Sequence, residues 1–211
     1  MRALIVLGGD APGRELLERC MRESDLTIAA DRGLCAFSGT ELLPDLLIGD
    51  MDSVPADVLA RYEGRVPARR LECIKDDTDG VDALDYAIGQ GAREITLLGA
   101  LGGRLDHALA NVMLLVRASR RGVRAQLLGE RVRIARVEGE EIIEDAVGDT
   151  LSLLPLGHAR GVTLTGFFYP LFDHTLASDY PLGVSNVITE RTARVRVLEG
   201  DLILFHHFGK V

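Results

Sequence analysis

Aspartate residues recur at the ends of short apolar runs in the first half of the chain. Asp31 closes one such run, and Asp50 closes the next, with Asp52 two residues later. Carboxylates held close together repel one another and need a compensating cation. Their oxygens suit Mg²⁺, which commonly links protein carboxylates to substrate phosphates. The set that we predict to form such a site is Asp31, Asp50, Asp52, Asp76, Asp79 and Asp106.

Several of these aspartates also fit a simpler role. Asp is a preferred residue at the N-cap of a helix, so Asp52, Asp79 and Asp106 each fit a capping position. For one aspartate taken alone, capping is the simpler explanation. The repeated placement of acids after strands favours a shared site, because ligands of open α/β sheets bind beyond the carboxyl ends of the strands.

A glycine-rich stretch at residues 99–106 (GALGGRLD) adds a second chemical element. Glycine lets the backbone approach a ligand closely, and helix amino termini favour anions. Arg104 is suited to bind a phosphate through two hydrogen bonds. Thr78 and Ser53 offer hydroxyl contacts, although capping or turn roles explain them equally well. Because tight turns also need glycine, the stretch indicates a phosphate site only beside the acids.

The elements that position these residues alternate between strand and helix up to about residue 128. Short apolar runs predict the strands, and apolar residues at helical spacing predict helices between them. This alternation predicts a mainly parallel sheet that helices cover on both faces. The predicted strands are Ala3–Leu7, Leu26–Ala30, Asp45–Ile48, Leu71–Ile74, Ile95–Leu98 and Val123–Leu128, and a long helix is predicted from Asp106 to Arg121.

The remainder of the chain has a different pattern. From Arg131 onward, short β-rich runs separated by single glycines predict a small antiparallel sandwich. We therefore predict a Rossmann-like α/β domain in residues 1–130 and a β-sandwich domain in residues 131–211. The predicted strands of the second domain are Arg131–Val137, Glu141–Glu144, Thr150–Leu154, Gly161–Leu164, Ala193–Leu198 and Leu202–His206.

The composition excludes several classes of protein. The chain has 32 acidic and 24 basic residues, so it lacks the basic surface that duplex nucleic acid or an anionic membrane requires. Residues 41–90 alone contain 12 acidic and 5 basic residues, which concentrates the negative charge around the predicted site. The phosphate-binding motif G-x-x-x-x-G-K-[ST] does not occur, and this excludes a P-loop NTPase.

The cysteines and the apolar runs bear on the cellular compartment. Cys20, Cys35 and Cys73 are widely spaced and form no zinc-type set, so we interpret them as buried, reduced thiols. The apolar run at the amino terminus is too short for the core of a signal peptide. No run approaches the roughly 20 apolar residues that span a bilayer. We expect a cytoplasmic protein that binds neither membranes nor nucleic acid.

Three motifs in a fixed order resemble those of the thiamine pyrophosphokinase family. They are G-D-x-D-S at residues 49–53, K-D-x-T-D at 75–79 and G-G-R-x-D-H at 102–107. In the second half, TLTGFFYPL at 163–171 and LGVSN at 182–186 also match. With AADRG at 29–33, the match extends from residue 29 to residue 186.

The resemblance implies a fold, a reaction and an assembly. The fold implied is an α/β nucleotide-binding, catalytic domain followed by a thiamine-binding β-sandwich domain, usually in a homodimer. In the reaction implied, the hydroxyl of thiamine attacks the β-phosphorus of ATP, thiamine diphosphate forms and AMP leaves. Mg²⁺ is the implied cofactor and ATP the co-substrate.

The resemblance also implies roles for individual residues. The catalytic set implied around Mg²⁺ and the phosphates is Asp50, Asp52, Asp76, Asp79 and Asp106, of which the first four are metal ligands. The residues implied for the ATP pocket are Asp31, Thr78, Arg104 and Asp106. Ser185 and Asn186 match the segment that lines the thiamine pocket. The general base is one of the aspartates, and Asp106 is one candidate.

Other functions remain open at the level of sequence. One alternative is a pyrophosphokinase that acts on another hydroxymethyl heterocycle, such as a pterin, although the stretch 183–186 favours thiamine. Another is a regulatory module that binds a nucleotide and has lost catalysis, against which the complete set of acids argues. A third is a metal-binding α/β protein that does not use ATP.

Overall fold

The computed structural model describes residues 1–70 and 78–209, and the chain divides into two compact units, Met1–Glu130 and Arg131–Val211. Asp76 and the predicted strand Leu71–Ile74 lie outside the described residues. No described helix is both long enough and apolar enough to span a bilayer. The first unit contains β1 (Arg2–Val6), α1 (Arg14–Arg22), β2 (Leu26–Ala30), the 3₁₀ helix η1 (Asp31–Phe37), β3 (Leu46–Gly49), α2 (Ala56–Tyr62), β4 (Ala68–Arg70), α3 (Asp79–Gly89), β5 (Glu94–Leu98), α4 (Leu105–Ser119) and β6 (Arg124–Leu128).

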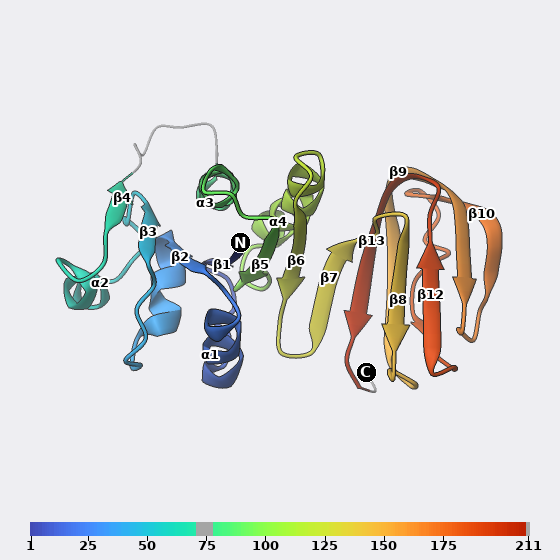
Figure 1. The fold of residues 1–211 in the computed structure, drawn as a ribbon, viewed down its shortest axis with the longest axis horizontal. Helices are drawn as coiled ribbons and strands as arrows, with labels where there is room; N and C mark the ends of the chain where they lie inside the picture. The colour runs from blue at the N-terminus through green and yellow to red at the C-terminus, as the bar shows by residue number, and fades with distance from the viewer. Residues whose placement is uncertain (71–77, 210–211) are drawn as a thin grey trace. The chain divides into compact units, whose positions relative to one another are not determined.

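The strands of the first unit form a parallel sheet in the order β4-β3-β2-β1-β5-β6 (Figure 1). The chain moves outward from β1 to β4 and then returns to place β5 on the other side of β1. The strand order therefore reverses between β1 and β5. In open α/β sheets, ligands bind beyond the carboxyl ends of the strands at such a reversal.

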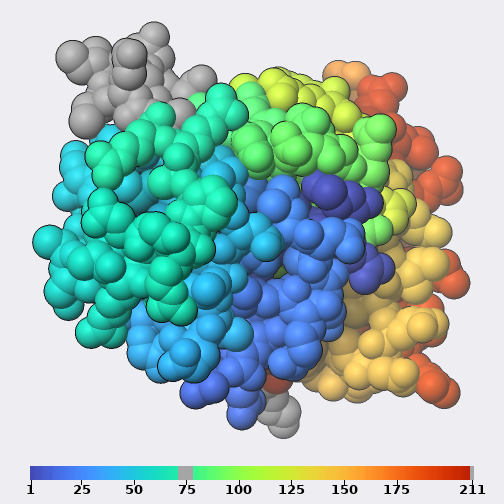
Figure 2. Space-filling model, turned by 60° about the vertical axis from the view of Figure 1, so that its left-hand side comes forward, coloured from blue at the N-terminus to red at the C-terminus, as the bar shows by residue number. Residues whose placement is uncertain are grey.

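Helices cover both faces of this sheet. Leu4 and Val6 of β1 share a buried core with Leu17 of α1. Ala3 and Ile5 of β1 point to the opposite face, because successive side chains of a strand alternate, and they are equally buried. On that face α3 packs against β1, β2 and β3, and α4 packs against β6. Figure 1 shows α1 on the opposite side of the sheet from α3 and α4, and Figure 2 shows the surface to which α1, η1 and α2 contribute, coloured blue to teal.

The second unit is antiparallel. Its longest strand, β9, pairs with β10, β11, β12 and β13; β13 also pairs with β7, and β12 with β8. Leu153 of β9, Val195 of β12 and Leu204 of β13 lie in one buried core. The strands are β7 (Val132–Arg136), β8 (Glu140–Glu144), β9 (Thr150–Thr165), β10 (Leu171–Ala177), β11 (Asn186–Val187), β12 (Thr192–Arg196) and β13 (Glu199–His207).

The fold confirms the predicted order of a parallel sheet with helices followed by an antiparallel region. The finer descriptions, Rossmann-like and sandwich, stay predictions. One prediction is wrong: Thr150–Leu154 and Gly161–Leu164 are parts of the single strand β9. Gly157 and Gly161 lie inside that strand with φ angles of 85° and 65°. Glycine at positive φ makes an irregularity within the strand at both positions, although the sequence pattern indicates a break between strands only at Gly157 and places Gly161 at the start of a strand.

Candidate active site

The crevice between β1 and β5 is built by close contact between two backbone segments. The amide of Gly9 donates to the carbonyl of Gly99 at 2.8 Å, and the amide of Asp10 donates to the carbonyl of Leu101 at 2.7 Å. Gly99 has a φ of 61°, and a β-carbon there would lie 2.2 Å from the carbonyl oxygen of Leu7. The segments can approach this closely only because glycine occupies that position.

A cavity of about 430 Å³ lies at this edge of the sheet. Its volume falls within the range of small-molecule sites. Four of the residues predicted for the site line it: Asp31, Thr78, Asp79 and Arg104. Asp50, Asp52 and Asp106 are not among the lining residues, so the acids do not all face one space. Other lining residues include Gly8, Gly9, Arg32, Ser53, Gly102, Gly103 and Asn111.

Three of the predicted acids converge at the ends of β2 and β3. One carboxylate oxygen from each of Asp31, Asp50 and Asp52 lies within 4.8 Å of the others. The hydroxyl of Ser53 donates to Oδ2 of Asp31. Among the described residues, Oδ1 of Asp31 is the only buried side-chain oxygen or nitrogen that has no hydrogen-bond partner. A buried carboxylate oxygen without a partner is costly, and a cation is one group that would satisfy it.

Local backbone geometry holds these acids in place. Asp31 and Met51 have positive φ angles of 44° and 66°, which are uncommon for residues other than glycine. The side chain of Met51 is buried in the core shared by α1 and η1. Burial of Met51 therefore anchors its two neighbours in the chain, Asp50 and Asp52. Gly49 leaves room for Asp31, because a β-carbon there would lie 3.0 Å from Cβ of Asp31.

Mutual repulsion marks this cluster electrostatically. The pKa of Asp52 is raised above its ordinary value, chiefly by the negative charge of Asp50 and also by a hydrogen bond between these two residues. Desolvation and the charges of Asp31 and Asp79 raise it further. The donor set consists of carboxylates, the ligands that hard cations such as Mg²⁺ prefer. The residues present therefore fit a divalent cation.

The start of α3 forms another wall of the cavity. Thr78 is the N-cap of α3, and its Oγ1 accepts a hydrogen bond from the amide of Val81 at 3.4 Å. Thr78 therefore does cap a helix. Because Thr78 also lines the cavity, its side chain is compatible with a ligand contact as well. Asp79 is the first residue of α3 and also lines the cavity.

The start of α4 brings a charged pair to the same edge. The guanidinium of Arg104 donates to Asp106 twice, with Nε–Oδ1 and Nη2–Oδ2 distances of 3.1 and 2.6 Å. These hydrogen bonds lower the pKa of Asp106 to about 2. The side chain of Arg104 is 73% exposed, so it is accessible to a ligand. A carboxyl group with so low a pKa is a weak proton acceptor, and this argues against Asp106 as the general base.

Sequence reasoning missed two parts of the site. Asn111, on the second turn of α4, donates from Nδ2 to the carbonyl oxygen of Ala100 at 2.8 Å and so supports the glycine-rich loop. Gly8 and Gly9, which directly follow the predicted strand Ala3–Leu7, also line the cavity. The pair had a usable signal, because glycines directly after the first strand of an α/β fold are typical of phosphate-binding turns.

The second unit contains the other two predicted site residues. Asn186 is 6% exposed and all its side-chain hydrogen bonds are internal. Its Oδ1 accepts from the amides of Tyr169 and Val187 at 3.0 and 2.9 Å, and its Nδ2 donates to the carbonyl of Tyr169 at 2.8 Å. Ser185 has a φ of 60°, and its amide donates to Oγ of Ser152 at 3.0 Å. Asn186 thus organises the loop that carries the exposed rings of Phe168 and Tyr169.

The first unit has the features of an α/β protein that binds a phosphorylated ligand together with a cation. Two family models match the chain: "Thiamin pyrophosphokinase, catalytic domain" over residues 17–127 and "Thiamin pyrophosphokinase, vitamin B1 binding domain" over residues 139–201. A thiamine pyrophosphokinase from Bacillus subtilis (strain 168) is 30% identical over 186 residues, which cover 86% of this chain and 87% of the relative.

Solved structures agree with these matches. The crystal structure of thiamine pyrophosphokinase from Bacillus subtilis has a TM-score of 0.86 at 25% identity and covers 100% of both chains. The enzyme from Geobacillus thermodenitrificans has a TM-score of 0.81 at 31% identity and covers 98% of this chain and 97% of its own. The chain belongs to the thiamine pyrophosphokinase family.

Proposed function

We propose that this protein transfers the pyrophosphoryl group of ATP to the hydroxyl of thiamine in a Mg²⁺-dependent reaction that releases AMP. The observation that carries the proposal is the convergence of Asp31, Asp50 and Asp52, with one buried carboxylate oxygen unpaired, beside a glycine-lined cavity. Membership of the family supports the substrates, because both of its domain models match.

The acids of the first unit hold the metal in this proposal. Asp50 and Asp52 are its ligands, together with Asp79 and with Asp76, which lies outside the described residues. A carboxylate oxygen of Asp31 lies within 4.8 Å of oxygens of Asp50 and Asp52. When Mg²⁺ is bound, it would neutralise negative charge on the triphosphate. The raised pKa of Asp52 supports this role, since a cation would relieve the repulsion from Asp50.

The remaining residues of the crevice bind and orient ATP. The backbone of the loop at 99–103 and the amino terminus of α4 are suited to the phosphates, because unpaired amides and the helix dipole favour anions. Arg104 contributes a planar guanidinium that can bind two phosphate oxygens. Thr78 and Asp106 complete the ATP pocket, and the hydrogen bonds of Asp106 keep the guanidinium of Arg104 oriented.

We assign residues 1–130 to nucleotide binding and catalysis, and residues 131–211 to thiamine binding. Ser185 contributes to the thiamine pocket, while Asn186 acts by holding the loop that presents Phe168 and Tyr169. Aromatic faces and edges of this kind are suited to a flat heterocycle. We further propose a homodimer. We also propose a cytoplasmic location, which the free thiols of Cys20 and Cys35 support.

Product analysis tests the proposal directly. The protein is incubated with ATP, Mg²⁺ and thiamine, and the nucleotide and vitamin products are separated by chromatography. We expect AMP and thiamine diphosphate in equal amounts and no turnover with a chelator present. ADP would instead indicate transfer of a single phosphoryl group, and turnover with a hydroxymethylpterin in place of thiamine would indicate the alternative substrate. Ligand-dependent thermal shifts without any product would indicate a regulatory module.

A further inference from the structure

A cluster of one acid and two bases, outside the cavity, joins α3 to the last turn of α4, which carries Arg117, and to the turn after α4, which carries Arg121. Nε and Nη2 of Arg117 donate to Oδ1 and Oδ2 of Asp85 at 2.9 and 2.7 Å. Arg121 adds contacts from Nη1 and Nη2 to the same two oxygens, at 3.0 and 3.2 Å. The hydrogen bond from Arg117 is the largest cause of a pKa for Asp85 below the ordinary value. We call Asp85, Arg117 and Arg121 the interhelix clamp.

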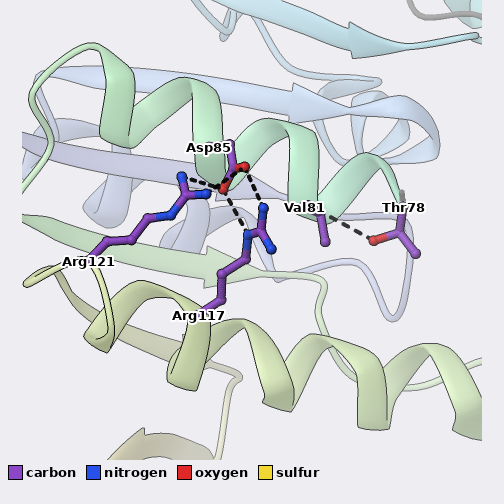
Figure 3. A network of polar contacts seen from close by, with 5 residues as sticks. All are labelled: Thr78, Val81, Asp85, Arg117 and Arg121. Carbon is purple, nitrogen blue, oxygen red and sulfur yellow. Dashed lines mark hydrogen bonds and ion pairs between the residues drawn. The ribbon is translucent and has the colours of Figure 1, made fainter. Parts of the chain in front are cut away.

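The clamp does not touch the predicted site. None of its residues lines the cavity that contains Asp79 and Arg104. Asp85 lies nearly two turns along α3 from Asp79, and Arg117 lies near the opposite end of α4 from Arg104. Figure 3 shows Thr78 at the start of α3 and Asp85 farther along the helix, where both guanidinium groups reach the one carboxylate. Any effect on chemistry must therefore act through the helices.

The two helices also contact each other close to the site. A β-carbon on Gly80 would lie 3.2 Å from Cδ1 of Leu114 and 3.4 Å from Oδ1 of Asn111, so the first turn of α3 sits directly on α4. Asn111 in turn donates to the carbonyl of Ala100 in the glycine-rich loop. Packing is thus continuous from the clamp to Asp79, the residue before Gly80, and to the loop that leads to Arg104.

We propose that Asp85 is a positioning residue: through the clamp it fixes α3 against α4 and so sets the place of Asp79 relative to Arg104. The inference rests on the proposed function. A single surface ion pair has little effect on structure, but two guanidinium groups that each contact both oxygens of one carboxylate restrict sliding and rotation of one helix along the other. A displacement of about 1 Å at reacting groups can reduce the rate up to about 100-fold.

Steady-state kinetics of substituted full-length protein test this inference. Asp85→Asn keeps the shape of the side chain but removes its charge and replaces one acceptor with a donor. We expect kcat to fall about tenfold while KM for thiamine stays within about twofold, because thiamine contacts are assigned to the other unit. Asp85→Glu keeps the charge that both arginines contact and should restore most of kcat.

A matched control separates positioning from general stability. Arg2 and Glu94 form an ion pair between the starts of β1 and β5, at the edge of the sheet opposite the cavity, with an Nε–Oε2 distance of 3.1 Å. Arg2→Met should leave kcat unchanged. All variants are compared at a temperature where circular dichroism shows them fully folded, and the rise in Tm produced by ATP with Mg²⁺ is measured as well. We expect this rise to be smaller for Asp85→Asn than for Arg2→Met.

The outcomes separate the two proposals. Wild-type protein that makes no AMP defeats the proposed function itself. Wild-type turnover with an unchanged kcat in Asp85→Asn overturns the clamp alone. An equal loss of kcat in Arg2→Met, or in Asp85→Glu, also overturns it, since the effect would then not depend on the charge at position 85.

Discussion

Carboxylates at the same edge of the sheet have opposite electrostatic surroundings. Asp52 lies beside Asp50, whose negative charge raises the pKa of Asp52. Asp106 accepts two hydrogen bonds from Arg104, and these lower its pKa to about 2. Neighbouring charges therefore act in opposite directions on the two acids. The raised pKa of Asp52 fits a place beside a cation, whereas Asp106 keeps an arginine oriented.

Substitution of Asp50 should separate catalysis from folding. Asp50→Asn removes one of the like charges in the cluster, and the Oδ1 of Asn can still accept the hydrogen bond from the amide of Asp52, so we expect the variant to fold normally. We expect Mg²⁺-dependent turnover to fall about 100-fold or more, because charge on the phosphates is no longer balanced. Asp57→Asn, an exposed acid in the first turn of α2, is the control. A near-wild-type rate for Asp50→Asn would remove Asp50 from the site.

The pair at the start of α4 makes a prediction about pH. Because the pKa of Asp106 is lowered from 3.8 to about 2, the ionised form is favoured in the folded protein. Its stabilising effect is present above pH 3.8 and is lost as the pH falls towards 2. The effect on stability is small, since both side chains are exposed. NMR titration of the Asp106 carboxyl should therefore give a pKa of about 2 in the wild type and a higher pKa in Arg104→Gln, still below 3.8 because the amide of His107 also donates to this carboxyl. Equal values in the two proteins would contradict the pairing.

At the scale of elements, the site exists because the strand order reverses at β1. The connections after β1 and β5 run side by side there and are joined by backbone hydrogen bonds between Gly9 and Gly99 and between Asp10 and Leu101. The helices α3 and α4 then begin at the same edge and direct Asp79 and Arg104 towards it. The position of each side chain is thus set by the topology of the sheet.

Glycine substitutions test the close approach of these segments. In Gly99→Ala the new β-carbon clashes with the carbonyl oxygen of Leu7, and the alanine must adopt a φ of 61°. Gly91→Ala imposes a similar backbone strain at a φ of 93°, with nothing within 4 Å of the new atom. We expect Gly91→Ala to lower the free energy of unfolding by about 1 kcal/mol and Gly99→Ala by roughly 3 kcal/mol. Chemical denaturation measures both, and equal losses would show that the contact with Leu7 is unimportant.

At the scale of the whole molecule, each unit has its own buried core, and the second also exposes aromatic rings. Phe168, Tyr169, Phe172 and Tyr180 are between 64% and 72% exposed. Exposed aromatic groups of this size usually mark a surface that a ligand or another chain covers. This agrees with our proposal that the protein is a homodimer whose second unit binds thiamine.

Light scattering coupled to size-exclusion chromatography tests the assembly. We expect a mass of twice the chain mass of 22.9 kDa. Phe172→Ser should shift the equilibrium towards the monomer, because it removes apolar area from the exposed surface that we propose a second chain covers. Val147→Ser is the control. Val147 is also exposed, at 61%, but it lies in a loop that is distant in sequence from these aromatic residues. A monomeric wild type at micromolar concentration would contradict the homodimer.

Much of the fold was predictable because apolar runs and glycines report directly on local structure. The strand Leu26–Ala30 was predicted with its observed bounds, since buried parallel strands are apolar on both faces. The second unit was harder. Gly157 resembles a residue that separates two strands but lies inside β9. The side chains of β10 are mostly exposed, so that strand lacks a buried alternation. Local pattern cannot distinguish a bulge from a turn when the deciding contacts are with distant strands.

The sequence by itself determined the chemistry: which acids, glycines and arginine occur, their order along the chain and, through the ordered motifs, the family. Only the tertiary structure decided which of them meet. Asp31 joins Asp50 and Asp52, whereas Asp106 pairs with Arg104 and Asn186 turns inward to the backbone of Tyr169. Residues far apart in the chain are brought together by strand order and helix packing, and distances of a few ångströms determine whether a carboxylate faces another acid or an arginine.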